Sequence, residues 1–87
     1  MNQDILFADI QTWDSERQAV NFPAQQGGAL INCWVSRVWL ENKCGQALAD
    51  EAAVLDAFSQ CRFDLEDIAE NLIEDEDFNQ DGDIEIN

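Results

Sequence analysis

The longest regular feature of the sequence is an apolar stripe between Asp50 and Asp77. Its residues recur at intervals of three and four, which is the repeat of one face of an α-helix. They are Val54, Phe58, Cys61, Leu65, Ile68 and Leu72. Asp50 suits the N-cap of this helix, because its carboxylate can accept a hydrogen bond from a first-turn amide. The stripe predicts a long helix over residues 51–76 that supplies most of the core and lies across a sheet.

Phe63 breaks this pattern, because it falls on the side of the helix opposite the stripe. Two interpretations are open. In the first, the helix divides near Arg62 and turns Phe63 inward. In the second, Phe63 is an exposed aromatic ring among acidic side chains, where a partner could use it. We favour the division, since helix propensity gives no reason to leave a phenylalanine in water. Arg62 precedes Glu66 by four residues, a spacing that favours a surface ion pair.

Shorter segments predict strands. In each of these segments, apolar residues either alternate with polar ones or form a short continuous run, as is typical of strands. These segments cover residues 4–8, 18–24, 29–35 and 83–87. Pro23 cannot donate a hydrogen bond to a sheet, so its strand ends there or lies at an edge. The polar and glycine residues 25–28 predict a loop between the two middle strands, which would then form a hairpin.

A second, short helix is predicted over residues 37–44. Ser36 suits its N-cap, and Gly45 suits a left-handed C-cap. An acidic turn and the last short strand occupy residues 77–87. Together the patterns predict one α+β domain over residues 1–87, a small two-layer structure whose antiparallel sheet of three to four strands carries both helices on one face.

The charge balance limits the partners of such a domain. The chain has 19 Asp and Glu against 4 Lys and Arg, a net charge of −15, and eleven of the acids lie between Asp64 and Glu85. A field of this sign repels nucleic acid and anionic membrane surfaces and attracts cations or basic protein surfaces. We therefore expect a basic protein surface as partner, with no direct nucleic-acid binding and no membrane association.

Cysteine usage and the N-terminal residues predict a cytoplasmic protein. Cys33, Cys44 and Cys61 form no CxxC pair, and the chain has no histidine to complete a structural zinc site. The first ten residues lack the basic and apolar regions of a secretory leader. Each cysteine occupies a position typical of a small core residue, so we expect three buried thiols.

The segment 77–85 resembles the first nine positions of a calcium-binding EF-hand loop. Oxygen-bearing side chains alternate along it, and Gly82 stands where that loop turns sharply. The candidate ligands are Asp77, Asn79, Asp81, Asp83 and Glu85. Position 12, which supplies a bidentate Glu in EF-hands, falls one residue past the last, Asn87. The sequence therefore predicts at best weak calcium binding, and an acidic turn into a strand is the alternative.

The outer face of the long helix is a candidate protein-interaction surface. Its acidic residues are Asp64, Asp67, Glu70, Glu74 and Asp75. They would speed association with a basic partner, and one form of such binding imitates the charge of nucleic acid. Trp34 and Trp39, if exposed, offer a different surface for a homodimer, although we favour a place in the core for both.

Catalysis is not expected. The chain has no histidine or tyrosine and a single lysine, so a general base near neutral pH would have to be a carboxylate or thiolate with a perturbed pKa. None of the three serines has an evident base partner, and there is no glycine-rich phosphate loop. We predict no catalytic residue and no cofactor apart from the weak calcium considered above.

Three runs of residues resemble a known family. They are the run WDSERQAVNFPA over residues 13–24, the run Ile31-Asn32-Cys33, and the residues Ala57, Phe58, Arg62 and 65–69. These runs are similar to the bacterial family called domain of unknown function 1488, and the resemblance extends from Ile5 to Ile86. It implies a compact α+β domain with no established activity, cofactor or catalytic residue. The acidic C-terminus is richer in Asp than the usual ending of that family. Our overall expectation is a non-catalytic interaction or accessory protein.

Overall fold

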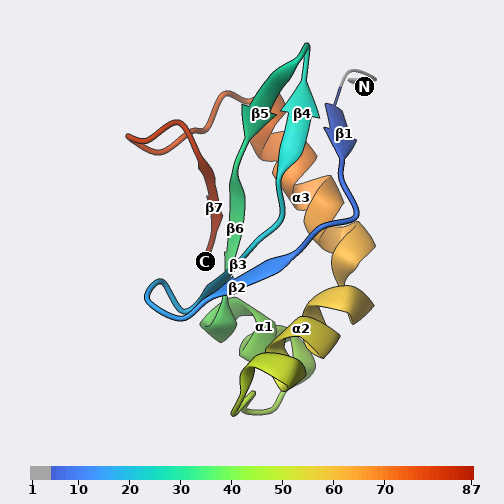
Figure 1. Ribbon diagram of the computed structural model, residues 1–87, viewed down its shortest axis with the longest axis vertical. Coiled ribbons are helices and arrows are strands. Elements are labelled where there is room, and N and C mark those ends of the chain that lie inside the picture. Colours follow the sequence, from blue (N-terminus) through green and yellow to red (C-terminus); the bar gives the residue numbers. More distant parts are fainter. Residues whose placement is uncertain (1–4) are drawn as a thin grey trace.

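The structure is a computed structural model that describes residues 5–87, so Asp4, the first residue of the expected strand 4–8, lies outside the described residues. The described chain forms two small sheets and three helices, which confirms the α+β class (Figure 1). The strands are β1 (Ile5–Phe7), β2 (Thr12–Asp14), β3 (Ala19–Asn21), β4 (Ala24–Gln26), β5 (Ala29–Ile31), β6 (Cys33–Ser36) and β7 (Ile84–Ile86). The helices are α1 (Arg37–Cys44), α2 (Glu51–Gln60) and α3 (Arg62–Glu74).

A long hairpin organises both sheets. β3 and β4 run up one arm, β5 and β6 run down the other, and the two halves keep one continuous register. The turn between the arms consists of Gly27 and Gly28, both with positive φ (57° and 84°), as a two-residue type I′ turn requires. The expected loop over 25–28 is therefore shorter than predicted. Gln25 and Gln26 belong to β4, because their backbones pair with β1 and β5.

The expected single antiparallel sheet is divided at the middle of this hairpin. One sheet has the order β1-β4-β5 and the other the order β2-β3-β6-β7. Pairing is interrupted at Phe22 and Pro23, where proline has no amide hydrogen to donate, and only Phe22 N still donates to Cys33 O at 2.8 Å. In the second sheet β7 pairs parallel to β6, whereas all other neighbours are antiparallel.

The segment that connects β1 to β2 forms a bulge opposite this interruption. Four residues, 8–11, separate β1 from β2, while only two, Phe22 and Pro23, separate β4 from β3. The two additional residues cannot pair with the hairpin, so the bulge leaves backbone groups that need other partners. Arg62 is one such partner, because its guanidinium donates a hydrogen bond to the carbonyl oxygen of Ala8 at 2.6 Å.

Both predicted helix starts and the C-cap of α1 are confirmed by the cap geometry. Ser36 Oγ accepts a hydrogen bond from Trp39 N at 3.0 Å, and Asp50 Oδ1 accepts one from Ala53 N at 2.8 Å. Gly45 ends α1 in the left-handed conformation with φ 74°. These signals are local, so they can be identified without knowing the tertiary fold.

The long helix divides at Cys61 into α2 and α3, as we favoured, but the division does not turn Phe63 inward. The Phe63 side chain is 80% exposed, so that part of the prediction is wrong. The apolar stripe nevertheless continues across the break, and Val54, Phe58, Cys61 and Leu65 are all buried. The break therefore changes the direction of the helix while both halves keep their apolar faces on the sheets.

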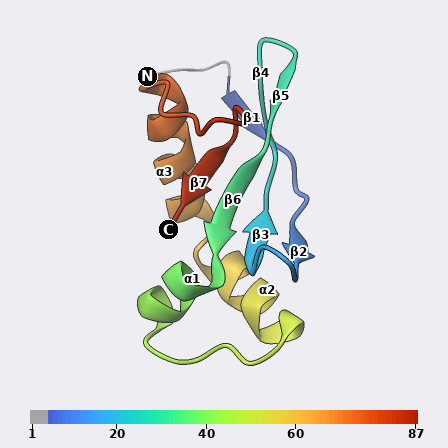
Figure 2. The ribbon, with the colours of Figure 1, turned by 90° about the vertical axis from the view of Figure 1, so that its left-hand side faces the viewer.

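The core lies between the sheets and the helices. α3 runs along one face of the sheets, and α1 and α2 pack at one end of them (Figures 1 and 2). Phe22 and Phe58 are fully buried with ring centroids 5.2 Å apart, at the point where the hairpin changes from one sheet to the other. Phe7 stacks on Phe22 at 6.2 Å. These rings fill the space that the interrupted strand pairing leaves.

Candidate functional site

The outer surface of α3 carries an exposed aromatic ring in line with acidic side chains. At about 100° per residue, Phe63, Asp67, Glu70 and Glu74 fall within about 60° of one another around the helix, over about 16 Å of its length. We call these four residues the Phe63 strip. Phe63 is the most exposed large apolar side chain of residues 5–87. One part of each interpretation of Phe63 therefore holds: the helix divides near Arg62, as in the first, and the ring of Phe63 stays in solvent, as in the second.

The neighbours of Phe63 fix its orientation. Leu65 and Ala69 are fully buried against the sheets, so the opposite side of α3, where Phe63 lies, must face solvent. Arg62 is held by four groups. It donates to Ala8 O and to Gln11 Oε1, and it forms ion pairs with Glu66 at 3.1 Å and with Asp9 at 3.7 Å. The first turn of α3 therefore cannot rotate to bury Phe63 without breaking these contacts.

The remaining residues of the predicted interaction surface lie beside the strip. Asp64 forms a 3.9 Å ion pair with Lys43 at the end of α1. Asp75 is the C-cap residue of α3. The side chains of Lys43 and Asp64 are both largely exposed, so their ion pair contributes little to stability. Asp75 is exposed as well. The structure thus brings Asp67, Glu70 and Glu74 together with Phe63, and places Asp64 and Asp75 at the margin of the same surface.

The C-terminal candidate ligands lie in a turn that Asn79 organises. Its Oδ1 accepts hydrogen bonds from Asp81 N and Asp83 N, both at 2.9 Å, and its Nδ2 donates to Glu85 Oε2 at 2.6 Å. Asp83 Oδ2 accepts a 3.2 Å hydrogen bond from Trp34 Nε1. Asn79 Oδ1, Asp83 Oδ2 and Glu85 Oε2 are thus engaged within the protein.

No group of three or more His, Cys, Asp or Glu side chains within residues 5–87 is arranged to hold a metal ion. Calcium binding would require the carboxylates of Asp77, Asp81 and Asp83 to converge on one ion, and Asp83 Oδ2 would have to release its hydrogen bond from Trp34 Nε1. The weak calcium site therefore stays a prediction, and the titration given in the Discussion tests it.

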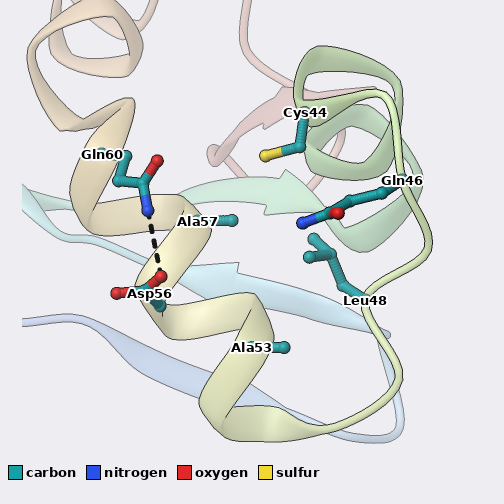
Figure 3. Close-up of a pocket in the computed structure, with 7 residues that line it drawn as sticks. All are labelled: Cys44, Gln46, Leu48, Ala53, Asp56, Ala57 and Gln60. Carbon is teal, nitrogen blue, oxygen red and sulfur yellow. Dashed lines mark hydrogen bonds between the residues drawn. The ribbon is translucent and has the colours of Figure 1, made fainter.

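A cavity of about 280 Å³ separates α1 from α2 (Figure 3). Leu48, Ala53 and Ala57 form its apolar part, while Gln60 Nε2 donates to Asp56 Oδ2 at 3.0 Å on its rim. The sulfur of Cys44 points from the end of α1 toward α2 in this view.

The three cysteines have different environments. Cys33 and Cys61 are buried, but Cys44 is exposed, so the expectation of three buried thiols is wrong at that position. Burial, with a smaller contribution from Asp83, raises the pKa of the Cys33 thiol to about 12. Burial also raises the pKa of the Cys61 thiol, and the neighbouring Cys44 side chain adds to this effect.

The two tryptophans of the candidate dimer surface are each half-buried. Trp39 packs against the core. Trp34 lies on the outer face of the second sheet, where the guanidinium of Arg17 stacks 4.0 Å from its ring centroid. A shallow depression of about 270 Å³ runs beside it, lined by Thr12, Trp13, Asp14, Asn21, Asn32 and Trp34. The Arg17 stack and the bond to Asp83 hold Trp34 in place, so this tryptophan has a structural role on the surface.

Taken together, the fold and these surfaces define a class: a small α+β protein of high negative charge whose most exposed aromatic ring lies on an acidic helix face. None of the helices over residues 5–87 is long and apolar enough to span a membrane. The chain belongs to the DUF1488 family, described as proteins of unknown function, whose model matches residues 5–86. The resemblance inferred from the sequence is confirmed.

Individual relatives support the same assignment. The chain is 37% identical over 76 residues to the uncharacterized protein YrdB of Escherichia coli strain K12, and 36% identical to YrdB of Shigella flexneri. Each alignment covers 87% of both proteins. A crystal structure of a DUF1488 protein of unknown function from Shewanella loihica PV-4 is 40% identical and superimposes with a TM-score of 0.94 over 99% of this chain and 94% of that one. The fold described here is thus that of a solved family member.

Proposed function

We propose that this protein is a non-catalytic interaction module that binds a basic protein surface through the Phe63 strip. The exposure of Phe63 is the observation that carries the proposal. An aromatic ring that is 80% exposed contributes nothing to the packing of its own chain, and burying it against a partner would remove most of its apolar surface from water. Aromatic residues, phenylalanine among them, are enriched at the core of protein interfaces.

The acidic residues of the strip give the partner its chemistry. Asp67, Glu70 and Glu74 follow Phe63 along the helix, and no basic residue follows Arg62 in the sequence. Within residues 5–87, the ion pairs that involve α3 use the carboxylates of Asp9, Asp64 and Glu66, so Asp67, Glu70 and Glu74 keep their charge available to a partner. A complementary surface would present an apolar pocket for the ring beside a row of lysine or arginine side chains.

The same arrangement favours protein over nucleic acid as the ligand. A chain with net charge −15 repels phosphate backbones at every approach, and the repulsion is strongest at the C-terminal third, where the strip lies. A row of carboxylates on a rigid helix can instead occupy a surface that otherwise binds a nucleic-acid backbone. Imitation of nucleic acid is therefore a special case of the proposal, in which the basic partner is a nucleic-acid-binding protein.

Affinity capture with matched variants tests the proposal. The purified protein, a Phe63→Ser variant and a Val38→Ser control are immobilised, and each is exposed to a bacterial lysate at low and high salt. Val38 is also an exposed apolar residue on a helix, but it lies on α1, outside the Phe63 strip. Because both side chains face solvent, neither substitution should change the thermal unfolding midpoint, which verifies folding.

The expected result is a partner retained by the wild type and by Val38→Ser but not by Phe63→Ser. Loss of a dominant aromatic contact costs about 2 kcal/mol or more, which weakens binding about thirtyfold. Retention should also fall at high salt and in an Asp67→Lys/Glu74→Lys variant, because both changes remove the electrostatic attraction. Equal capture of the same proteins by the wild type and the Phe63→Ser variant would refute the proposed surface.

A further inference from the structure

Two of the three cysteines lie where the end of α1 approaches the break between α2 and α3. Cys44 is the last residue of α1, and Cys61 is the residue that separates α2 from α3. Cys44 lines the cavity between α1 and α2 together with Ala57 and Gln60, the residue before Cys61. The Cys44 side chain also contributes to the raised pKa of the Cys61 thiol. An ion pair between Lys43 and Asp64, 3.9 Å long, joins the same two segments on the residues beside them. The cavity lining and the ion pair thus place Cys44 and Cys61 in the same small region, where the end of α1 faces the break between α2 and α3.

The Cys44 and Cys61 thiols also differ in their exposure to solvent. Cys44 is exposed, and its sulfur points toward α2 at the cavity between α1 and α2 (Figure 3). Cys61 is buried, so an oxidant in solution reaches Cys44 first. An accessible thiol that forms a sulfenic acid next to a second, protected thiol is the usual arrangement of a reversible oxidation site. Cys33, which is fully buried elsewhere in the core, has no part in it.

We propose that Cys44 and Cys61 form a peroxide-sensitive modification site that closes reversibly to an intramolecular disulfide. The Cys44 thiolate attacks one oxygen of hydrogen peroxide and breaks the O–O bond, which gives Cys44 sulfenic acid and, after protonation, water. The Cys61 thiolate then attacks the Cys44 sulfur, forms the S–S bond and expels hydroxide, which takes up a proton as a second water. Each peroxide is reduced by two electrons, and the two thiols lose one hydrogen each. A thiol reductant reverses the reaction.

The pH dependence of the second step follows from the environment of Cys61. Its raised pKa keeps the group as a thiol near neutral pH, and only the thiolate can attack sulfenic acid. Disulfide closure should therefore accelerate as the pH rises through the alkaline range. Besides burial, Cys44 and the Asp64 carboxylate add to the raised pKa of Cys61, whereas Lys43 lowers it, so a Lys43→Met variant should close more slowly at the same pH.

Mass spectrometry of the full chain tests the site. Purified protein is treated with hydrogen peroxide, its remaining thiols are alkylated, and peptides are mapped. We expect wild type and a Cys33→Ala control to lose two hydrogens and to yield a Cys44–Cys61 cross-linked peptide, and we expect Cys44→Ser and Cys61→Ser to yield none. The cross-link closes a loop between residues 17 positions apart, which should raise the thermal midpoint of the oxidised wild type by about 10 °C.

Two results would overturn the proposal. One is further oxidation of Cys44 to sulfinic acid while Cys61 of the folded protein stays free. The other is a disulfide between the Cys44 residues of two molecules in place of the internal one. Because Cys44 is exposed, the Cys44→Ser variant should fold normally, so the comparison does not depend on substituting the buried Cys61.

Discussion

Arg62 joins three parts of the fold that are distant in sequence, and its replacement by methionine tests that role. Its side chain is only 16% exposed. Its guanidinium donates to Gln11 Oε1 at 2.7 Å and to Ala8 O at 2.6 Å, pairs with Glu66, and lies 5.4 Å from the ring centroid of Phe58. Arg62 also forms an ion pair with Asp9 at 3.7 Å, so its side chain connects the bulge over residues 8–11 to the start of α3.

The magnitude follows from these contacts. A hydrogen bond from a charged donor contributes about 1.5–3 kcal/mol when it is protected from water. Ala8 is exposed and Gln11 half-buried, so water can replace part of both bonds, while Glu66 loses its partner in a half-buried position. Methionine keeps most of the apolar stem that covers Phe58. We therefore expect Arg62→Met to lower the free energy of unfolding by about 2–3 kcal/mol, which lowers the thermal midpoint by about 10–20 °C.

Urea unfolding followed by tryptophan fluorescence measures this change, with Arg17→Met as the matched control. Arg17 also stacks on an aromatic ring, that of Trp34, but it is exposed, so its loss should cost about 1 kcal/mol or less. A double variant with Glu66→Gln should be less destabilised than the sum of its single variants, because both remove the same ion pair. A loss below about 1 kcal/mol for Arg62→Met would show that the bulge does not depend on Arg62.

Other residues give predictions of the same kind. Phe58→Ala should lower the free energy of unfolding by about 3–5 kcal/mol, since its ring is fully buried against Phe22, and a loss below about 1 kcal/mol would contradict this packing. Glu76, the residue after the C-cap of α3, has φ 57°, a conformation that glycine adopts without strain, so Glu76→Gly should stabilise the protein by about 0.5–1 kcal/mol in the same urea assay; destabilisation would count against the strain. Because the folded state holds Cys33 neutral with a pKa of about 12, against an ordinary value of 9.0, stability should fall as the pH rises from about 9 to 12, and less so in Cys33→Ala; equal losses would exclude Cys33 as the cause. A calcium titration by amide NMR, with magnesium and Asp77→Ala as controls, should show weak, calcium-selective shifts limited to residues 77–85 if the truncated loop binds; equal shifts for both ions across the acidic surface would exclude a site.

The features that the sequence predicts correctly are those with local causes. Ser36, Gly45 and Asp50 mark helix ends because a cap depends on a single side chain and the amides next to it. The apolar stripe depends on helical periodicity alone, and four of its six residues, Val54, Phe58, Cys61 and Leu65, are buried, while Ile68 and Leu72 are half-buried against the core. Family membership is also recoverable, because the runs that carry the resemblance lie within residues 5–86.

The features that the sequence does not predict depend on distant partners. Gln25 and Gln26 have no strand propensity, and they join β4 only because β1 and β5 lie on either side of it. The bulge over residues 8–11 and its attachment to Arg62 arise from a mismatch in register that no single segment contains. The helix pattern correctly places Phe63 opposite the core, but our assumption that a phenylalanine must be buried led to the wrong conclusion.

Photo-crosslinking in living cells tests the proposed interaction surface most directly. A photoreactive phenylalanine analogue replaces Phe63 in one variant and Val38 in a control, and cross-linked products are compared after irradiation. The Phe63 strip predicts a discrete product of higher mass from position 63, weaker when Asp67 and Glu74 are changed to lysine, and none from position 38. No product from position 63, or the same products from both positions, would contradict the assignment of this helix face as the binding surface.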